Sequence, residues 1–283
     1  MLSVNELEDR LIDLAFAEDI GDGDHTTLCC IPDDAMGSSR LLIKEDGILA
    51  GVEVAKKVFN RFDPDLKIEV MIDDGARVKK GDIAFVVTGK VRSLLQTERL
   101  MLNIMQRMSG IATMTHRYVE RLEGTKTRVL DTRKTTPGMR MLEKQAVKIG
   151  GGTNHRIGLF DMILLKDNHV DFAGGIENAI DRCHAYLKEK GLDLKIEIEV
   201  RNFDELNRVI SHGGVDRIML DNFSVEDTKK AVDIIDGRFE TESSGGITID
   251  TLRDYALQGV DFISVGALTH SVKGLDMSFK ATF

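Results

Sequence analysis

The stretch VLDTRKTTPGMRMLEKQAVKIGGGTNHRIGLFDMILLKDNH, residues 129–169, contains two short apolar runs, each followed by cationic residues. Between residues 131 and 169 seven Lys/Arg stand against four Asp/Glu, whereas the chain of 283 residues carries 38 Lys/Arg against 47 Asp/Glu. Cations gathered around glycine-rich turns in an acidic chain favour a pocket for a small, multiply anionic ligand. A solvated basic face is the simpler alternative, and this stretch alone leaves both open.

The pattern that begins in this stretch continues to residue 265 as short apolar runs alternating with helical periodicity. The expected strands span residues 128–130, 162–165, 195–200, 217–220, 238–241 and 262–265, and the expected helices span residues 139–149, 176–188, 203–211, 225–235 and 249–258. Such alternation predicts parallel strands joined by right-handed crossovers. Because no Gly-x-Gly-x-x-Gly follows the first strand and no P-loop motif occurs, we expect an open or nearly closed parallel β/α barrel rather than a doubly wound sheet.

The first part of the chain has a different pattern, which predicts an α+β region with antiparallel pairing. Ser3 and Glu6 form a capping box ahead of a first helix, and residues 52–62 have helical periodicity. A second capping box, Ser93 with Gln96, is expected to open a long helix. Strands are expected at residues 40–44, 48–50, 66–72 and 83–88, with a hairpin turn at Asp46-Gly47 between the first two.

Composition and charge restrict the function classes. A length of 283 residues with 42% hydrophobic residues fits one large or two ordinary globular domains. A formal net charge of −9 argues against a nucleic-acid-binding surface, and no apolar run approaches the roughly 18 residues that a membrane span needs. Cys29, Cys30 and Cys183 lack metal-ligand spacing and are expected to be reduced thiols. We therefore expect a cytoplasmic protein without a nucleic-acid or membrane partner.

Polar side chains follow the expected strands at the ends where the loops of a barrel converge. Arginine and lysine bind carboxylates or phosphates, and the candidates are Arg133, Lys134, Arg156 and Lys166. The turns after the last two strands contain Gly245-Gly246 and Gly266-Ala267, which can bring main-chain N–H groups to a phosphate. These residue types together predict a site for a ligand that carries both carboxylate and phosphate groups.

Two carboxylates, Glu199 and Asp221, face these cations in the expected barrel. They suit ribose hydroxyls, Mg²⁺ or a carbon that develops positive charge. His155 stands beside Arg156 after three glycines, and it is either a ligand-binding residue or an ordinary buried histidine. No Ser/His/Asp set stands in a recognisable context, so acyl hydrolysis has little support.

These residues resemble the quinolinate phosphoribosyltransferase family, the decarboxylating nicotinate-nucleotide pyrophosphorylases of NAD biosynthesis. The central motifs of the resemblance are residues 131–138 (DTRKTTPG), 150–159 (GGGTNHRIGL) and 166–169 (KDNH). Further similarity lies in residues 17–19, 23–27, 98–99, 220–223 and 264–270, so the resemblance covers nearly the whole chain.

The resemblance implies an N-terminal α+β sandwich-like domain over residues 1–110 and a β/α barrel over residues 111–270. It also implies that the C-terminal tail, residues 271–283, packs back on the first domain. A homodimer, alone or within a higher oligomer of dimers, would share its active sites between subunits. Arg99 of the partner subunit would complete each site, giving a role to an otherwise unremarkable arginine.

The resemblance also assigns residues to each substrate. Quinolinate would be bound by Thr132, Arg133, His155, Arg156 and Lys166. 5-Phosphoribosyl 1-pyrophosphate and Mg²⁺ would be surrounded by Lys134, Lys166, Glu199, Asp221, Ser244, Gly245, Gly246, Gly266, Ala267, Leu268 and His270. The catalytic residues would be Lys134, Lys166, Glu199 and Asp221, and the two carboxylates would hold Mg²⁺ directly or indirectly.

Between the carboxylate near residue 199 and Asp221 the chain is one residue longer than the usual family spacing. This leaves Glu197 or Glu199 for the ribose and Mg²⁺, and Glu199 is preferred because it lies nearer the strand end. Two alternative functions remain beside decarboxylating transfer to quinolinate. One is a phosphoribosyltransferase for nicotinate, and the other is a molybdenum-transport-associated relative that binds an oxyanion or a phosphorylated metabolite.

Overall fold

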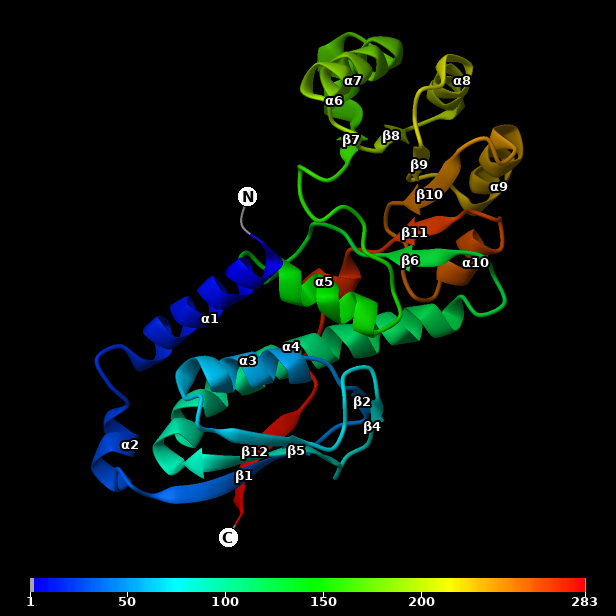
Figure 1. Cartoon of the computed structure of the whole chain (residues 1–283). Coiled ribbons are helices and arrows are strands. Elements are labelled where there is room, and N and C mark those ends of the chain that lie inside the picture. The colour runs from blue at the N-terminus through cyan, green and yellow to red at the C-terminus, as the bar shows by residue number, and fades with distance from the viewer. Residues whose placement is uncertain (1–2, 283) are drawn as a thin grey trace. The chain divides into compact units, whose positions relative to one another are not determined.

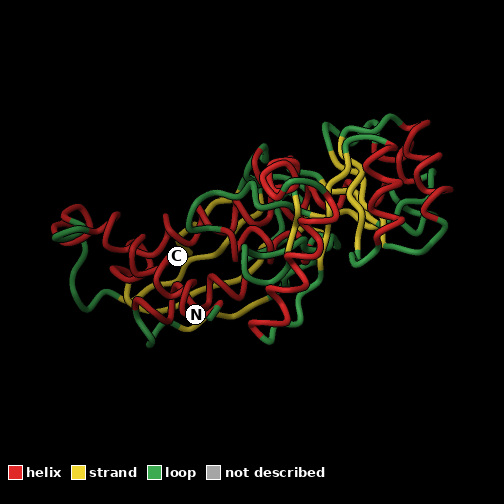
Figure 2. The backbone as a smooth tube through the Cα atoms, turned by 90° about the horizontal axis from the view of Figure 1, so that it is seen from above, coloured by secondary structure: helices red, strands yellow, loops and turns green. Residues whose placement is uncertain are grey.

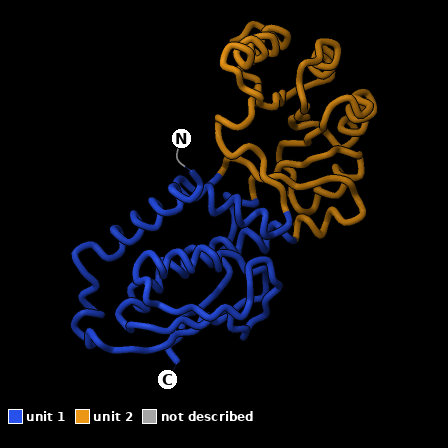
Figure 3. The backbone as a smooth tube through the Cα atoms, in the orientation of Figure 1, with its two compact units in different colours: residues 1–116, 135–151, 268–283 blue, residues 117–134, 152–267 orange. Residues whose placement is uncertain are grey.

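A computed structural model describes residues 3–282, and by their contacts the residues divide into two compact units (Figure 3). Unit 1 comprises Met1–His116, Thr135–Gly151 and Leu268–Phe283, and unit 2 comprises Arg117–Lys134 and Gly152–Ala267. Helix α4 (Val91–Arg121) contains the division between residues 116 and 117. In the described part of the chain, no helix combines the length and the apolar character that crossing a membrane would need.

Unit 1 contains an antiparallel sheet in the order β12-β1-β5-β3 (Figure 1). Its strands are β12 (Met277–Thr282), β1 (Met36–Ile43), β5 (Ile83–Lys90) and β3 (Lys67–Val70). Three buried phenylalanines join the sheet to helix α3 (Val52–Phe62): the ring centroid of Phe59 lies 6.1 Å from those of Phe85 and Phe279. Burial of aromatic rings of this size stabilises the unit substantially.

The hairpin expected at Asp46-Gly47 is wrong. Strand β2 (Gly47–Ile48) pairs with β4 (Arg77–Val78), while β1 pairs with β5 and β12. The Asp46 carboxylate accepts the main-chain N–H of Lys80 at 2.8 Å, so this residue ties two loops together instead of closing a hairpin. The turn residues therefore indicate that the chain changes direction here, but they do not show that β2 pairs with β4 and not with β1.

The first helix of unit 1 begins where local side chains satisfy main-chain N–H groups. The capping box of α1 (Val4–Ile20) is confirmed: Ser3 Oγ accepts the N–H of Glu6, and the Glu6 carboxylate accepts the N–H of Ser3 at 2.7 Å. The second capping box is wrong because α4 begins at Val91, and Ser93 Oγ instead donates to Asp63 at 2.6 Å. The unit also contains α2 (His25–Cys30) and α5 (Arg140–Ile149).

Unit 2 contains a six-stranded parallel sheet in the order β6-β11-β10-β9-β8-β7 (Figure 1). Strands are drawn in yellow in Figure 2. The strands are β6 (Arg128–Leu130), β7 (Ile163–Leu165), β8 (Ile196–Val200), β9 (Arg217–Asp221), β10 (Glu240–Ser244) and β11 (Phe262–Ser264). Strands β6 and β7 are the two edges. The predicted parallel β/α barrel is confirmed in its open form, and a closed barrel is not what the strands form.

Helices connect the strands of unit 2 and cover the sheet with apolar side chains. They are α6 (Asp167–Ala173), α7 (Ile176–Lys190), α8 (Phe203–His212), α9 (Val225–Ile235) and α10 (Leu252–Ala256). A buried cluster that includes Ile180, Ile198 and Leu206 joins helices α6, α7, α8 and α9 to β7, β8 and β9. Because this apolar cluster lies between helices and sheet, the polar side chains of the same strands are left for the strand ends and the interior of the barrel.

Candidate active site

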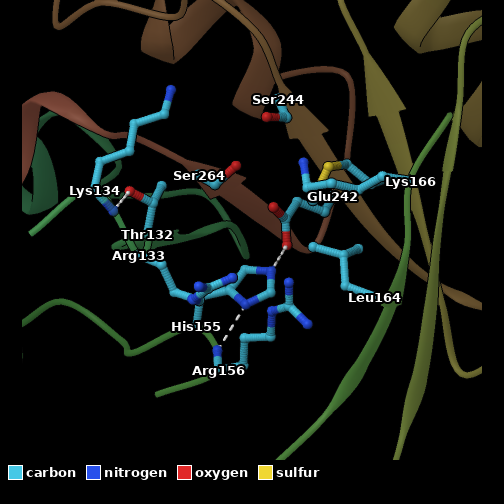
Figure 4. A pocket seen from close by; sticks show the side chains of 11 residues that line it. Thr132, Arg133, Lys134, His155, Arg156, Leu164, Lys166, Glu242, Ser244 and Ser264 are labelled. Atoms are coloured by element: carbon cyan, nitrogen blue, oxygen red, sulfur yellow. Dashed lines mark hydrogen bonds and ion pairs between the residues drawn. The ribbon is translucent and has the colours of Figure 1, made fainter. Parts of the chain in front are cut away.

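A pocket of about 310 Å³ lies at the carboxyl ends of the unit 2 strands (Figure 4). Thr132, Arg133 and Lys134 follow β6, Lys166 follows β7, and Ser244 and Ser264 end β10 and β11. The pocket is lined by Thr132, Arg133, Lys134, His155, Arg156, Leu164, Lys166, Met219, Glu242, Ser244 and Ser264. The loops of a parallel barrel converge at this edge, which is where such folds bind ligands.

Cationic side chains dominate the mouth of the pocket. Arg133, Lys134 and Lys166 are largely exposed, whereas Arg156 is partly buried and its Nη1 donates to the main-chain oxygen of Met162 at 3.3 Å. Burial, and then the positive charge of Arg133, lower the pKa of Arg156. Two guanidinium groups held together in this way repel each other, and an anionic ligand between them relieves that repulsion.

Of the two candidate carboxylates on β8, Glu199 and Glu197, it is Glu199 that contacts a cation of the pocket wall. Its Oε2 lies 3.1 Å from Nζ of Lys166, and 10% of its side chain is exposed. Glu197 is fully buried and lies below, next to His155. Asp221 ends β9 opposite Ser244 of β10, and its Oδ2 accepts a hydrogen bond from Asn222 at 2.7 Å.

The floor of the pocket is a buried polar cluster. His155 Nε2 lies 3.0 Å from Oε2 of Glu197 and 3.5 Å from Oε2 of Glu242. Arg217 Nη1 lies 3.2 Å from Oε2 of Glu242 and 3.9 Å from Oε2 of Glu197. The carboxyl groups come from β8 and β10, and Arg217 comes from β9 between them.

The His155 ring is in contact with the main chain as well as with these carboxyl groups. Nδ1 accepts the main-chain N–H of Arg156 at 2.6 Å, so Nδ1 carries no proton and the ring proton is on Nε2. The Asp131 carboxylate, itself buried, accepts the N–H of His155 at 2.9 Å. Dashed lines in Figure 4 join His155 to Glu242 and to Arg156.

Burial determines the charge of this floor. It raises the pKa of Glu242 to about 8, with further contributions from Glu197, and it also raises the pKa of Glu197. Burial alone would lower the pKa of Arg217, but the neighbouring Glu197, Glu242 and Glu240 raise it. Near neutral pH the floor therefore carries less negative charge than two glutamates suggest, which favours an anion above it.

The glycine turns of the sequence prediction follow β10 and β11. Gly245 and Gly246 both have positive φ, 102° and 62°. A Cβ on Gly245 would lie 2.2 Å from Oδ1 of Asn222, so only glycine fits this close approach. Gly266 and Ala267 lead into the short helix α11 (Ala267–His270).

The pocket brings together seven of the predicted residues: Thr132, Arg133, Lys134, His155, Arg156, Lys166 and Ser244. Glu199 contacts Lys166, and Asp221 neighbours Ser244 in the sheet. Arg99 lies on α4 in unit 1, to which Leu268 and His270 also belong, whereas the pocket is formed within unit 2.

Sequence reasoning missed four lining residues, Leu164, Met219, Glu242 and Ser264. Leu164 and Met219 were read only as strand residues, yet they provide the apolar part of the wall. Glu242 was missed because β10 was expected to end at residue 241, and the run Glu240–Ser244 has no apolar signal. A strand that places polar residues inside a barrel is difficult to distinguish from a loop.

The fold and the pocket define an open parallel β/α barrel protein that binds a small, multiply anionic ligand at its strand ends. Sequence models for the N-terminal and C-terminal domains of quinolinate phosphoribosyl transferase match residues 24–109 and 111–280. The chain belongs to the quinolinate phosphoribosyl transferase family.

Its relatives share most of their length with it. It is 46% identical over 285 residues to the chloroplastic nicotinate-nucleotide pyrophosphorylase [carboxylating] of Arabidopsis thaliana, covering 95% of this chain and 81% of the relative. The probable nicotinate-nucleotide pyrophosphorylase of Bacillus subtilis is 39% identical, with 96% and 93% covered. The crystal structure of NadC from Streptococcus pyogenes superposes with a TM-score of 0.92 at 40% identity, covering 100% of this chain and 98% of that one. Human nicotinic acid phosphoribosyltransferase, at 11% identity and a TM-score of 0.64, shares the fold alone.

Proposed function

We propose that this enzyme transfers the phosphoribosyl group of 5-phosphoribosyl 1-pyrophosphate to quinolinate in the unit 2 pocket. The products are nicotinate mononucleotide, CO₂ and pyrophosphate, a step of NAD biosynthesis. The observation that carries the assignment is the convergence of Arg133, Lys134, Arg156 and Lys166 on one pocket. A pyridine diacid requires several cations held apart by a rigid frame, and the strand ends supply that frame.

The two substrates divide the pocket between them. Arg133 and Arg156 suit the two carboxylates of quinolinate through paired N–H donors, and Leu164 and Met219 supply apolar surface for its ring. Ser244 and the Gly245-Gly246 turn suit phosphate oxygens on the other side. This arrangement brings the ring nitrogen towards C1 of the ribose, which is the orientation that nucleophilic attack requires.

In the reaction the ring nitrogen forms a bond to C1 as the bond from C1 to pyrophosphate breaks. The transition state resembles an oxocarbenium ion, and the negative charges of Glu199 and Asp221 favour it. Alkylation makes the ring a pyridinium, so the carboxylate beside the nitrogen leaves as CO₂. The electron pair left on that carbon then takes a proton from water. Lys134 and Lys166 balance the charge of pyrophosphate as it departs.

Mg²⁺ fits the donor set at this edge of the sheet, because carboxylate oxygens are its preferred protein ligands. Glu199 and Asp221 would hold it together with phosphate oxygens of the substrate. Bound there, Mg²⁺ would neutralise charge on pyrophosphate. Lys166 already contacts Glu199, and among residues 3–282 the group of three possible ligands that lie close together is His155, Glu197 and Glu242 instead. Magnesium binding is therefore expected to depend on the pyrophosphate substrate.

We also infer a homodimer, alone or within a larger assembly of dimers, in which Arg99 of the partner subunit completes each site. Support comes from the family resemblance and from the position of Arg99 outside the residues that line the pocket. Arg99→Ala and Arg133→Ala are each expected to be inactive, and mixing them under conditions of subunit exchange should restore part of the activity. Failure to recover activity despite demonstrated exchange would remove Arg99 from the shared site.

We place the enzyme in the cytoplasm, by analogy with the bacterial relative. The names of the plant relatives describe chloroplastic and mitochondrial proteins, so location differs within the family. The assignment would be checked by fractionating cells that express the full chain.

The direct test of the activity is to incubate the protein with Mg²⁺, quinolinate and 5-phosphoribosyl 1-pyrophosphate, and to identify the products. Nicotinate mononucleotide, CO₂ and pyrophosphate in equal amounts are expected. Turnover with nicotinate but none with quinolinate would contradict the decarboxylating assignment. No turnover with either, combined with calorimetric binding of molybdate, would favour the oxyanion-binding alternative.

Variants should locate the reaction in the pocket. Arg156→Ala is expected to lower kcat/KM for quinolinate, because it removes a partly buried charged contact. The decrease should correspond to a loss of about 2–5 kcal/mol of transition-state stabilisation. Arg182→Ala is the matched control, since Arg182 is an exposed arginine on α7 of the same unit, and its kcat/KM should stay unchanged. Equal losses in both variants would show that the pocket is not the binding site.

A further inference from the structure

The buried cluster of His155, Glu197, Arg217 and Glu242 lies directly below the proposed quinolinate site. All four residues are at most 8% exposed, and residues of this kind are rarely buried unless they are paired. Stability of the sheet does not explain the cluster, because a buried ion-pair cluster is on balance no more stabilising than well-packed apolar residues. The cluster therefore calls for an explanation in terms of the site above it.

The arrangement points to a chain of contacts that ends at Arg156. The carboxyl groups of Glu197 and Glu242 lie 3.0 and 3.5 Å from His155 Nε2, which carries the ring proton. On the other side of the ring, Nδ1 accepts the main-chain N–H of Arg156 at 2.6 Å. One tautomer and one ring orientation satisfy both contacts, so the position of the ring determines where the main chain of Arg156 lies.

We propose that Glu242 is a positioning residue for quinolinate binding: with Glu197 it holds the His155 ring, and the ring holds the main chain from which Arg156 extends into the pocket. This role rests on the proposed function, because it is the binding of quinolinate that the aligned guanidinium serves.

Arg217 provides the charge that allows two carboxyl groups to be buried together. Its Nη1 is within 3.2 Å of Glu242, and its Nη2 is 3.0 Å from Glu240 on the same strand. The cluster thus contains a cation of its own in the place where three potential ligands could otherwise hold a metal ion. This favours a polar support for the His155 ring over a second metal site, and metal analysis distinguishes the two.

The test compares three variants of the full-length enzyme. Glu242→Gln keeps a polar side chain of the same size next to Nε2 of His155, whereas Glu242→Leu has a similar size and no polar atom there. Glu240→Gln is the matched control, because Glu240 contacts Arg217 from the same strand and its side chain is 38% exposed. KM and kcat are measured for quinolinate and for 5-phosphoribosyl 1-pyrophosphate separately.

For Glu242→Leu we expect KM for quinolinate to rise by about tenfold or more, since a small misplacement of a binding group has effects of this size. KM for the ribosyl donor should change little, and Glu242→Gln and Glu240→Gln should remain close to the original enzyme. Equal increases of both KM values, or a Glu242→Leu enzyme that behaves like Glu240→Gln, would overturn the proposal. So would a stoichiometric metal ion that Glu242→Gln removes.

A second measurement does not depend on the variants folding or on turnover. In a ¹⁵N-histidine-labelled protein, the His155 ring should show an unprotonated Nδ1 and a protonated Nε2, with assignment from a His155→Asn sample. A protonated Nδ1 would overturn the proposal even if quinolinate is the substrate. If quinolinate is not turned over while the tautomer is as expected, the function has failed and the contact chain stands.

Discussion

Two strands, one from each sheet, bury side chains of opposite polarity. Strand β5 of unit 1 buries Ala84, Phe85 and Val87, whereas β10 of unit 2 buries Thr241, Glu242 and Ser243. The first sheet closes on a cluster of aromatic rings, and the second directs charged groups into the interior of its barrel. Burial of the β5 side chains stabilises the fold, while burial of the β10 side chains holds polar groups whose desolvation is unfavourable and whose use lies in the site.

The aromatic side of this comparison should show the largest effect on stability. Phe85→Ala removes a fully buried ring that contacts both Phe59 and Phe279, and we expect a loss of about 3–5 kcal/mol in the free energy of unfolding. Denaturant titration followed by circular dichroism measures it. Phe172→Ala, whose ring is 90% exposed, is the control and should change the free energy by less than about 0.5 kcal/mol.

In the buried charged cluster of unit 2, a single substitution should lower the stability of the protein, and further substitutions in the same chain should restore it. Arg217→Met leaves Glu197 and Glu242 without their cation, and a loss of about 3–5 kcal/mol is expected. Replacing both glutamates by Leu in the same chain should recover most of that stability while quinolinate binding is lost. If the combined variant is less stable than Arg217→Met alone, the cluster stabilises the fold and the contrast between the sheets disappears.

The pH dependence of stability isolates one member of the cluster. Because the pKa of Glu242 is raised from near 4.5 to about 8, the folded protein binds more protons than the unfolded chain between these values. The contribution of Glu242 to stability is therefore present at low pH and is lost as pH rises through this window. Glu242→Gln should gain stability relative to the original protein between about pH 5 and pH 8, as followed by the unfolding midpoint. Glu240→Gln should not show this trend.

The smallest effect is expected to be equal in the two units, because helix caps depend on local contacts. Ser3 caps α1 in unit 1 and Ser224 caps α9 in unit 2, each accepting a main-chain N–H three residues ahead. Ser3→Ala and Ser224→Ala should each lower the free energy of unfolding by about 1 kcal/mol. A much larger loss for Ser224→Ala would show that the units differ in their helices as well as in their cores.

Periodicity was sufficient where a segment has one apolar face. The bounds of α3 (Val52–Phe62) and α9 (Val225–Ile235) agree with their predicted ranges. Prediction failed where long-range pairing decides the structure: the turn at Asp46-Gly47 gives no information on whether β1 pairs with β2 or with β12. It also gave no indication of α6 (Asp167–Ala173), which lies between the strand expected at residues 162–165 and the helix expected at residues 176–188.

In the candidate site, the position of a residue along the chain is enough to predict the cationic side chains, but it does not predict the buried residues that hold them in place. Arg133 and Lys166 follow apolar runs and are recognisable as strand-end residues. Glu242 lies in a polar run, and its contact with His155 joins positions that only the order of the strands brings together. Residue type thus predicts what a pocket can bind, while the buried contacts that hold it in shape depend on tertiary structure.

The pairing of β12 with β1 has a consequence for synthesis on the ribosome. Thr282 donates to the main-chain oxygen of Ser38, a residue 244 positions earlier. The N-terminal sheet therefore cannot be completed until all of unit 2 has been translated, and until then one edge of strand β1 is unpaired. Domains tend to fold as they emerge from the ribosome, so unit 2 is expected to fold first. The sheet of unit 1, whose first strand is made earliest, is then expected to be completed last. A chaperone that shields β1 should therefore raise the yield of folded protein.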